Sequence, residues 1–167
     1  MKLIFVRHGI AGDKVKFALS GRPDAARPLT AKGVKKMKKA AGGLKKITGR
    51  ADAVVSSPYT RAVQTAQILA KKLGIKKTEK TAALGPSGRL ADLFAYLRKY
   101  AAAATVVLAG HEPHLGNIIS QCLGGPGAAF VSLGKGGACM VEFKGKPASG
   151  KAALVWLLEP GHLQRLG

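Results

Sequence analysis

The amino-acid sequence opens with an apolar run that ends abruptly in polar residues and a glycine: Leu3-Ile4-Phe5-Val6-Arg7-His8-Gly9. An apolar run of this length, bounded in this way, predicts a buried β-strand. Arg7 and His8 would then lie at the carboxyl end of the strand, where Gly9 turns the chain away. The run lacks the length and the cleavage site of a signal peptide, so we interpret it as part of the fold.

The size of the chain favours one domain. With 167 residues it is long enough to bury a substantial core, and we expect residues 1–167 to form a single domain. No apolar stretch approaches the ~20 residues of a membrane-spanning helix. Cys122 and Cys139 have neither metal-site nor disulfide-type spacing. We therefore expect a cytoplasmic protein with no membrane partner.

The charge balance is strongly positive. The sequence has 28 Lys and Arg against 8 Asp and Glu, a net charge of +20. Such a field attracts polyanions and phosphorylated ligands, although helical lysines can simply form a solvated surface. Nucleic acid is not the expected partner, because aromatic residues make up only 5% and do not alternate with the basic runs. A surface for duplex nucleic acid stays open as an alternative.

The rest of the chain alternates between strand and helix signals. Thr30, Ser57 with Pro58, and Pro113 are residues typical of helix starts. Strands are expected at 52–56, within 76–83, at 105–109, 138–143 and 152–158; helices at 30–44 (ending near Gly42-Gly43 or a few residues later), 57–74, 90–97 and 113–123; and a long loop at 10–28. This order predicts a three-layer α/β/α sandwich with a mostly parallel sheet, closed by a hairpin.

Four side chains would meet where the parallel strands end. Arg7 and His8 follow the first strand, Arg61 lies in the helical turn after the second, and His111 follows the strand at 105–109. Guanidinium forks and helix N-termini bind phosphate oxygens, and a neutral imidazole is a competent nucleophile. The neighbouring arginines should lower the pKa of His8 and keep its ring neutral. The expected ligand is a phosphoryl group.

These residues resemble three signature blocks of the histidine phosphatase superfamily, the phosphoglycerate mutase-like or RHG family. The order of the blocks also matches, from Met1 to about Leu123. The blocks are Val6-Arg7-His8-Gly9; Ser56-Ser57-Pro58 with Arg61, Ala62 and Thr65; and Gly110-His111. The start of the family's second helix is similar to Arg27-Pro28-Leu29-Thr30 with Gly33. Two further segments are similar to the small SixA-type phosphohistidine phosphatase branch: Leu84-Gly85-Pro86 and Gly110-His111-Glu112-Pro113.

The resemblance implies a phosphoglycerate mutase-like fold and a phosphatase mechanism. His8 would attack phosphorus and become transiently phosphorylated, while Arg7, Arg61 and His111 hold the phosphoryl oxygens. Water would then release phosphate. The resemblance implies no metal and no cofactor, a pocket that accepts phosphate or sulfate, and a phosphohistidine-containing protein as substrate, with a small phosphomonoester as the alternative.

One departure from the broader family bears on the substrate. Many members carry a carboxylic acid that protonates the leaving oxygen, but the matching stretch 82–88 contains neither Asp nor Glu. Phosphohistidine has a better leaving group and needs no dedicated strong acid, so the departure favours the SixA-type branch. Glu79 and Glu112 are the remaining candidates for an acid.

Other residues have both a functional and a structural interpretation. Gly9 and Gly110 would let the backbone approach phosphate closely. Glu112 and His114 would either contact substrate or cap the helix that begins at Pro113. Asn117 is a further candidate for substrate binding if its helix position faces the pocket. The basic residues of the long loop would either select an acidic substrate or be solvated: Arg22, Arg27, Lys14 and Lys16. His162 is expected to be structural, and a polyanion-binding module without catalysis is the competing function.

Overall fold

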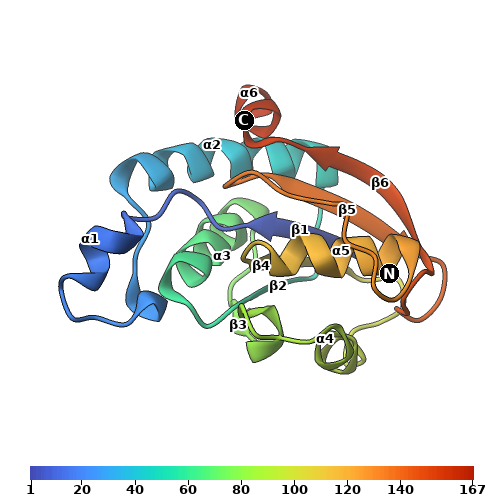
Figure 1. Ribbon diagram of the computed structural model, residues 1–167. Helices are drawn as coiled ribbons and strands as arrows, with labels where there is room; N and C mark the ends of the chain where they lie inside the picture. Colours follow the sequence, from blue (N-terminus) through green and yellow to red (C-terminus); the bar gives the residue numbers. More distant parts are fainter.

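The computed structural model describes residues 1–167 and has three layers, with a six-stranded sheet between two layers of helices (Figure 1). No helix is both long enough and apolar enough to cross a membrane. The elements are β1 (Lys2–Arg7), α1 (Lys14–Ala18), the 3-10 helix η1 (Asp24–Ala26), α2 (Ala31–Thr48), β2 (Ala53–Ser56), α3 (Thr60–Leu73), β3 (Glu79–Lys80), the 3-10 helix η2 (Ala82–Leu84), α4 (Leu90–Leu97), β4 (Thr105–Gly110), α5 (His114–Gly124), β5 (Ala138–Phe143), β6 (Ala152–Leu158) and α6 (Pro160–Leu166).

The strands lie in the order β3-β2-β4-β1-β5-β6. The first four strands along the chain are parallel, whereas β5 and β6 form an antiparallel hairpin at one edge. The expected α/β sandwich with a mostly parallel sheet is therefore confirmed. Its register aligns the strand ends that matter, because Arg7 pairs with Gly110 and Ser56 pairs with Ala109.

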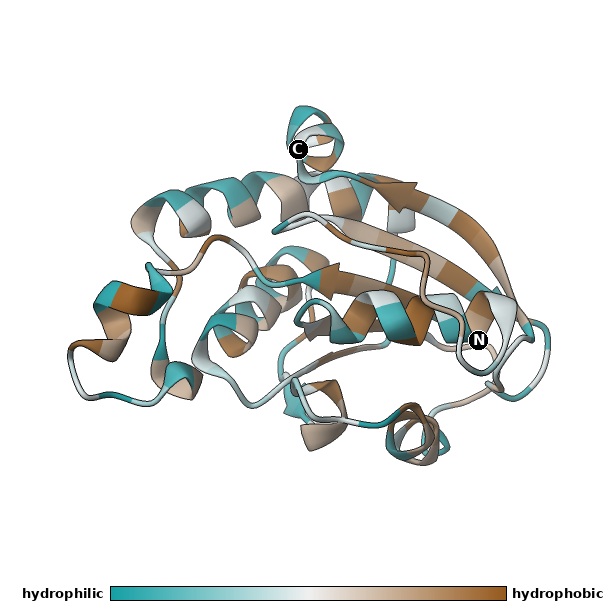
Figure 2. Ribbon diagram, in the orientation of Figure 1, coloured by the Kyte–Doolittle hydropathy of each residue, from teal (hydrophilic) through white to brown (hydrophobic).

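The opening strand is buried on both faces. Leu3 and Phe5 pack into the core beneath α4 and α5, whereas Ile4 and Val6 pack into the core beneath α2 and α3. All four side chains are at most 1% exposed. A strand covered on both sides needs a continuous apolar run rather than an alternating one, which is the pattern that the sequence has. Figure 2 shows this pattern as the brown, hydrophobic colour of the strands at the centre of the sheet.

Two helix ends lie where the sequence places them. The Thr30 hydroxyl caps α2 and accepts a hydrogen bond from the Gly33 amide at 2.9 Å. Gly74 ends α3 in the left-handed conformation that glycine favours, with φ at 78°. The start of α3 is different: the helix begins at Thr60, after Tyr59, and not at Ser57 and Pro58. Helix α5 begins at His114, with Pro113 just before it.

Residues 10–28 are more ordered than the expected loop. They contain α1, which Asp13 caps by accepting a hydrogen bond from the Lys16 amide at 2.8 Å, and η1. Arg27 closes the segment because its Nη1 donates to the Gly12 carbonyl at 2.7 Å. The segment is therefore a folded strap beside the strand ends.

The C-terminal helix α6 is absent from the sequence-based expectation, and it explains why α2 continues through Gly42-Gly43 to Thr48. Helix α6 packs against α2, and a Cβ atom on Gly43 would lie 2.1 Å from the Leu163 carbonyl oxygen. Leu163 itself is buried, at 1% exposed. The two glycines therefore let two helices approach closely and do not end the first one.

Replacing Gly43 with alanine should consequently destabilise the fold, although alanine favours helices. We expect a loss of about 2 kcal/mol in the free energy of unfolding, the usual cost of overpacking a close contact. Gly161→Ala in α6 is the matched control, because its Cβ would meet only Arg165 at 3.6 Å. Urea denaturation measures both variants; equal stabilities for Gly43→Ala and the wild type would contradict this packing.

Candidate active site

The side chain of His8 is held in one orientation at the end of β1. It is 7% exposed, and its Nδ1 lies 2.7 Å from the Gly9 carbonyl oxygen. A carbonyl accepts hydrogen bonds only, so Nδ1 carries the proton and Nε2 carries the lone pair. The Nε–H of Arg61 donates to that Nε2 at 3.2 Å, which agrees with this tautomer. His8 thus presents an unprotonated nitrogen to the site.

Arg61 lies in the first turn of α3, directly after the end of β2. Besides its contact with His8, its Nη1 donates to the Asp24 backbone carbonyl at 2.9 Å, and its Nη2 is 3.0 Å from the Asp24 carboxylate. The guanidinium also lies 5.0 Å from the centre of the Tyr59 ring. Arg61 is 5% exposed, so these partners fix a charged fork in a largely buried position.

His111 follows β4 and faces His8, with ring centres 5.1 Å apart. Its Nε2 is 2.8 Å from the Ser57 hydroxyl, and its buried Nδ1 has no partner. The same Ser57 oxygen accepts a hydrogen bond from the Tyr59 amide at 3.3 Å, so Ser57 lies in the turn before α3 and holds His111. A buried nitrogen without a partner marks a place where a ligand can bind.

Arg7 completes the set at the end of β1. Its Nη1 donates to the Leu133 carbonyl at 2.6 Å, whereas its buried Nε has no partner. The Leu133 contact anchors the arginine to the segment that precedes β5. One part of the guanidinium is therefore fixed, and other nitrogens are free for a ligand.

The structure brings Arg7, His8, Arg61 and His111 together in one cavity of about 800 Å³. The cavity lies at the carboxyl ends of the parallel strands, where β1 points toward α1 in Figure 1. Its remaining lining residues are Ala11, Gly12, Asp13, Lys14, Asp24, Arg27, Tyr59, Pro86, Glu112 and Lys135. Its five cationic side chains and two imidazoles outnumber its three carboxylates, an environment suited to an anion.

Both histidines of the site are kept neutral at physiological pH. The pKa of His8 is lowered to about 4, and burial is the largest cause. The Gly9 hydrogen bond works to raise this pKa, whereas the charges of Arg61 and Arg7 work to lower it. Burial likewise lowers the pKa of His111 to about 3, helped by His8 and Arg61. Neutral imidazoles can donate a lone pair, which protonated rings cannot.

A titration followed by long-range proton–nitrogen NMR tests this electrostatic picture. The ring nitrogens of His8 and His111 should stay in their neutral pattern as the pH falls from 8 to about 5, well below the ordinary histidine pKa of about 6.5. Because the unfolded chain takes up these protons first, the free energy of unfolding should also fall with pH below about 6.5. A midpoint near 6.5 for His8 would contradict the burial described above.

Several of the other predicted residues lie elsewhere. Arg22 packs over the Phe17 ring at 5.2 Å, His114 donates from Nε2 to the Ala83 carbonyl at 2.9 Å, and Asn117 is exposed on α5. None of these three lines the cavity, whereas Arg27 and Glu112 do. Arg22, His114 and Asn117 thus lie outside the cavity, because the orientation of a loop or of a helix face does not follow from local sequence pattern alone.

The glycines have a packing role as well. A Cβ on Gly9 would lie 2.5 Å from Met37 Cγ of α2, and the Gly9 amide donates to the Thr65 hydroxyl at 3.1 Å. A Cβ on Gly110 would lie 2.9 Å from Leu115. Both positions need glycine because neighbouring helices lie close, a reason that differs from the predicted approach of phosphate.

Asp24 is the main residue of the site that sequence reasoning missed. Its carboxylate bridges Arg61 and Arg27, with Oδ1 2.8 Å from the Arg27 Nε. Burial works to raise its pKa, but the hydrogen bond from Arg27 and the charge of Arg61 outweigh burial and hold the pKa below its usual range. Its position three residues before Arg27 is the signal that could have identified it.

The two glutamates considered as acids differ. Glu79 lies outside the cavity, where its carboxylate accepts hydrogen bonds from Tyr96, Tyr100 and Lys99. Glu112 lines the cavity and accepts a hydrogen bond from the Leu133 amide at 3.1 Å; burial is the largest cause that raises its pKa. No three His, Cys, Asp or Glu side chains gather to hold a metal ion.

The chain is similar in sequence to known proteins. The sequence model of the histidine phosphatase superfamily (branch 1) matches residues 3–85. The chain is 36% identical over 139 residues to an uncharacterized protein of Picosynechococcus sp. (strain PCC 7002), covering 82% of each chain. It is 27% identical to the phosphohistidine phosphatase SixA of Escherichia coli (strain K12), covering 98% of this chain and 97% of that protein.

Solved structures show the same fold. The protein histidine phosphatase SixA complexed with tungstate superposes with a TM-score of 0.79 at 26% identity, over 98% of this chain and 99% of that one. A phosphoserine phosphatase from Entamoeba histolytica shares the fold with a TM-score of 0.66 at 20% identity, over 97% and 98% of the two chains. The chain therefore belongs to the histidine phosphatase superfamily, in its SixA-type branch, and is a phosphatase.

Proposed function

We propose that this phosphatase removes the phosphoryl group from phosphohistidine in a protein, through a covalent intermediate on His8. The observation that carries the proposal is the unprotonated Nε2 of His8, which faces the cavity between two arginines and a second neutral histidine. The similarity to SixA, whose structure was solved with tungstate, supports a phosphoryl group as the ligand.

In the first step the His8 Nε2 lone pair attacks phosphorus, and the bond from phosphorus to the substrate imidazole breaks. The substrate imidazole leaves with the bonding pair and takes up a proton. Arg7, Arg61 and His111 stabilise the charge on the phosphoryl oxygens, which is the main requirement of phosphoryl transfer. In the second step water attacks the phosphorus atom of phosphorylated His8, and the bond between phosphorus and Nε2 breaks. The bonding pair returns to Nε2, which regenerates the neutral ring, and phosphate leaves as the attacking water gives a proton to solvent.

The phosphoryl group would share Arg61 with Asp24. In the structure the two Nη atoms of Arg61 are hydrogen-bonded to Asp24, while its Nε is hydrogen-bonded to His8. Asp24 thus holds the fork in place before substrate arrives, so that less ordering is needed when it binds. The low pKa of Asp24 keeps it ionised and makes it a poor proton donor.

The choice of phosphohistidine over a phosphomonoester rests on the leaving group. The stretch 82–88, which contributes Pro86 to the cavity, supplies no carboxylic acid for an alkoxide. An imidazole leaves more readily and needs no strong acid beside it. A small phosphomonoester is the second candidate, because Glu112 lines the cavity with a raised pKa and could protonate a leaving oxygen.

A substrate panel separates the two candidates. Phosphate release is measured with a histidine-phosphorylated protein and with phosphoserine and p-nitrophenyl phosphate, all in the presence of a metal chelator. We expect the phosphohistidine substrate to be turned over with the highest kcat/KM, and Glu112→Gln to change that value less than threefold. A preference for phosphomonoesters that Glu112→Gln removes would overturn the assignment in favour of the second candidate.

A further inference from the structure

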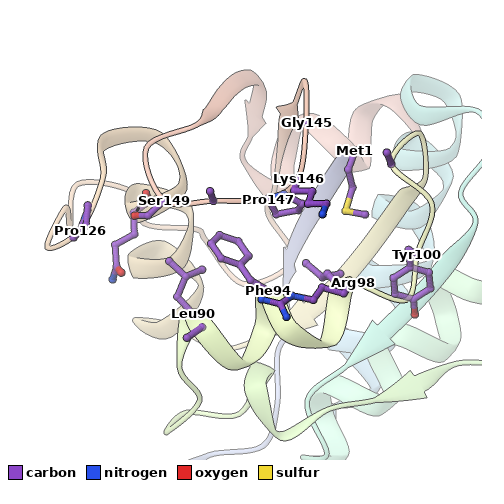
Figure 3. A pocket seen from close by; sticks show the side chains of 15 residues that line it. Met1, Leu90, Phe94, Arg98, Tyr100, Pro126, Gly145, Lys146, Pro147 and Ser149 are labelled. Atoms are coloured by element: carbon purple, nitrogen blue, oxygen red, sulfur yellow. Dashed lines mark hydrogen bonds between the residues drawn. The ribbon is translucent and has the colours of Figure 1, made fainter.

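A second cavity, of about 1010 Å³, lies at the opposite end of the sheet from the active site. Met1 precedes β1 and Ala102 precedes β4, so the cavity lies at the amino ends of the strands whose carboxyl ends carry Arg7 and His111. Its walls come from α4, the end of α5 and the β5–β6 hairpin (Figure 3). No residue lines both cavities.

One wall of this cavity is apolar. Leu90, Phe94 and Leu97 of α4 line it, and Pro147 lies on the hairpin opposite. Phe94 meets Phe143 edge to face, with ring centres 6.1 Å apart, and its own ring projects into the cavity (Figure 3). Phe94 stays half-buried rather than covered, so this wall leaves an aromatic surface open to a ligand.

The charged groups of the cavity are all of one sign. Arg98, directly after α4, and Lys146 from the hairpin line it, and none of its lining residues is acidic. Neither cation takes part in any of the four salt bridges of the protein. Both are exposed, so they can reorient toward a ligand without first breaking an ion pair. Tyr100 and Ser149 add hydroxyl groups, although these already donate to Glu79 and to the Gln121 carbonyl.

We propose that this cavity binds a small organic anion with an aromatic or branched apolar body. The body would contact Phe94 and Leu90, and a carboxylate, sulfonate or phosphate group would lie between Arg98 and Lys146. The volume is at the upper end of small-molecule sites, and an apolar surface with a few placed charges is their usual composition. The proposal concerns a site apart from the catalytic cavity and does not depend on the substrate proposed above.

Calorimetry with 2-naphthalenesulfonate, against the uncharged 2-naphthalenesulfonamide, tests this assignment. We expect saturable binding of the sulfonate, at least tenfold weaker binding of the sulfonamide, and at least tenfold weaker binding of the sulfonate to Arg98→Glu/Lys146→Glu. Phe94→Ala should weaken the binding of both compounds. The control Lys71→Glu/Lys72→Glu makes the same charge change on exposed lysines of α3 and should bind like the wild type. Far-ultraviolet circular dichroism and thermal melting verify that each variant is folded.

His8→Ala separates this cavity from the active site. Naphthalenesulfonate binding that survives this substitution supports a second site, and binding that it removes places the sulfonate in the catalytic cavity and overturns the proposal. Equal loss of binding in Arg98→Glu/Lys146→Glu and in the control Lys71→Glu/Lys72→Glu would show a non-specific response to net charge. Equal affinity for the sulfonate and the sulfonamide would show an apolar site without anion selectivity. Each of these last two results, or no binding at all, also overturns the proposal.

Discussion

Replacing His8 with alanine should reduce the rate of phosphate release from a histidine-phosphorylated protein by at least about 10³-fold, because removal of a covalent nucleophile eliminates the step on which the others depend. No other imidazole of the cavity directs its Nε2 to the other site residues as His8 does. The only other imidazole there, His111, directs its Nε2 to the Ser57 hydroxyl at 2.8 Å. The measurement is single-turnover release of phosphate at pH 7.5.

The fold itself should tolerate this change, so the loss can be assigned to chemistry. His8 is a small part of the buried core, and its ring makes two hydrogen bonds, one to its own neighbour Gly9 and one from Arg61, which keeps its Asp24 partners without it. His162→Ala is the matched control, since it removes an exposed histidine of α6 that lies outside the cavity. It should retain the wild-type rate. Turnover in His8→Ala within tenfold of the wild type would exclude His8 as the nucleophile.

Replacing Arg61 with alanine should have the second largest effect, a loss of about 10³-fold in kcat. In GTPases, an arginine that stabilises the transferred phosphoryl group contributes on the order of 10³–10⁵ in kcat, and we expect an effect at the lower end of this range. Arg61 also orients His8 through its Nε and holds Asp24 through its Nη atoms. Its removal leaves the Asp24 carboxylate near the phosphoryl oxygens with one cation fewer, which adds repulsion to the lost attraction.

Arg61→Lys should recover little of this loss, because a single ammonium cannot contact His8 and two phosphoryl oxygens together. Arg22→Ala is the control for Arg61→Ala, since both substitutions remove one positive charge and Arg22 lies over Phe17 outside the cavity. We expect Arg22→Ala to stay within threefold of the wild type in kcat. Full activity of Arg61→Lys would mean that charge alone matters and that the fork geometry does not.

The sequence predicts most of the sheet and the meeting of the four central side chains. The buried runs at 105–109 and 138–143 are long and unambiguous, and parallel strands place their carboxyl ends at one edge. Two of those ends carry Arg7 and His111, so their proximity follows from topology. The cap at Thr30 and the end at Gly74 depend on local chemistry and are also predicted correctly.

The elements that sequence reasoning missed depend on contacts between distant segments. Helix α6 begins with Pro160 and Gly161, is seven residues long, and is stabilised by packing on α2 rather than by its own propensity. Gly42 and Gly43 have the sequence pattern of a helix end, but Gly167 and Leu163 of the C-terminal segment lie beside them. Asp24 was missed for the same reason, since a carboxylate in a loop gains a role only when Arg61 arrives from another element.

The phosphorylated enzyme itself provides the most direct test of the central claim. Wild-type protein is mixed with a substrate protein that carries ³²P on histidine, quenched in alkali within milliseconds, and digested for mass spectrometry. The mechanism predicts label on His8 that is stable in alkali and lost in acid, as a phosphorus–nitrogen bond requires, and no label in His8→Ala. Label on another residue, or rapid turnover with no labelled enzyme at any time in wild-type protein, would contradict it.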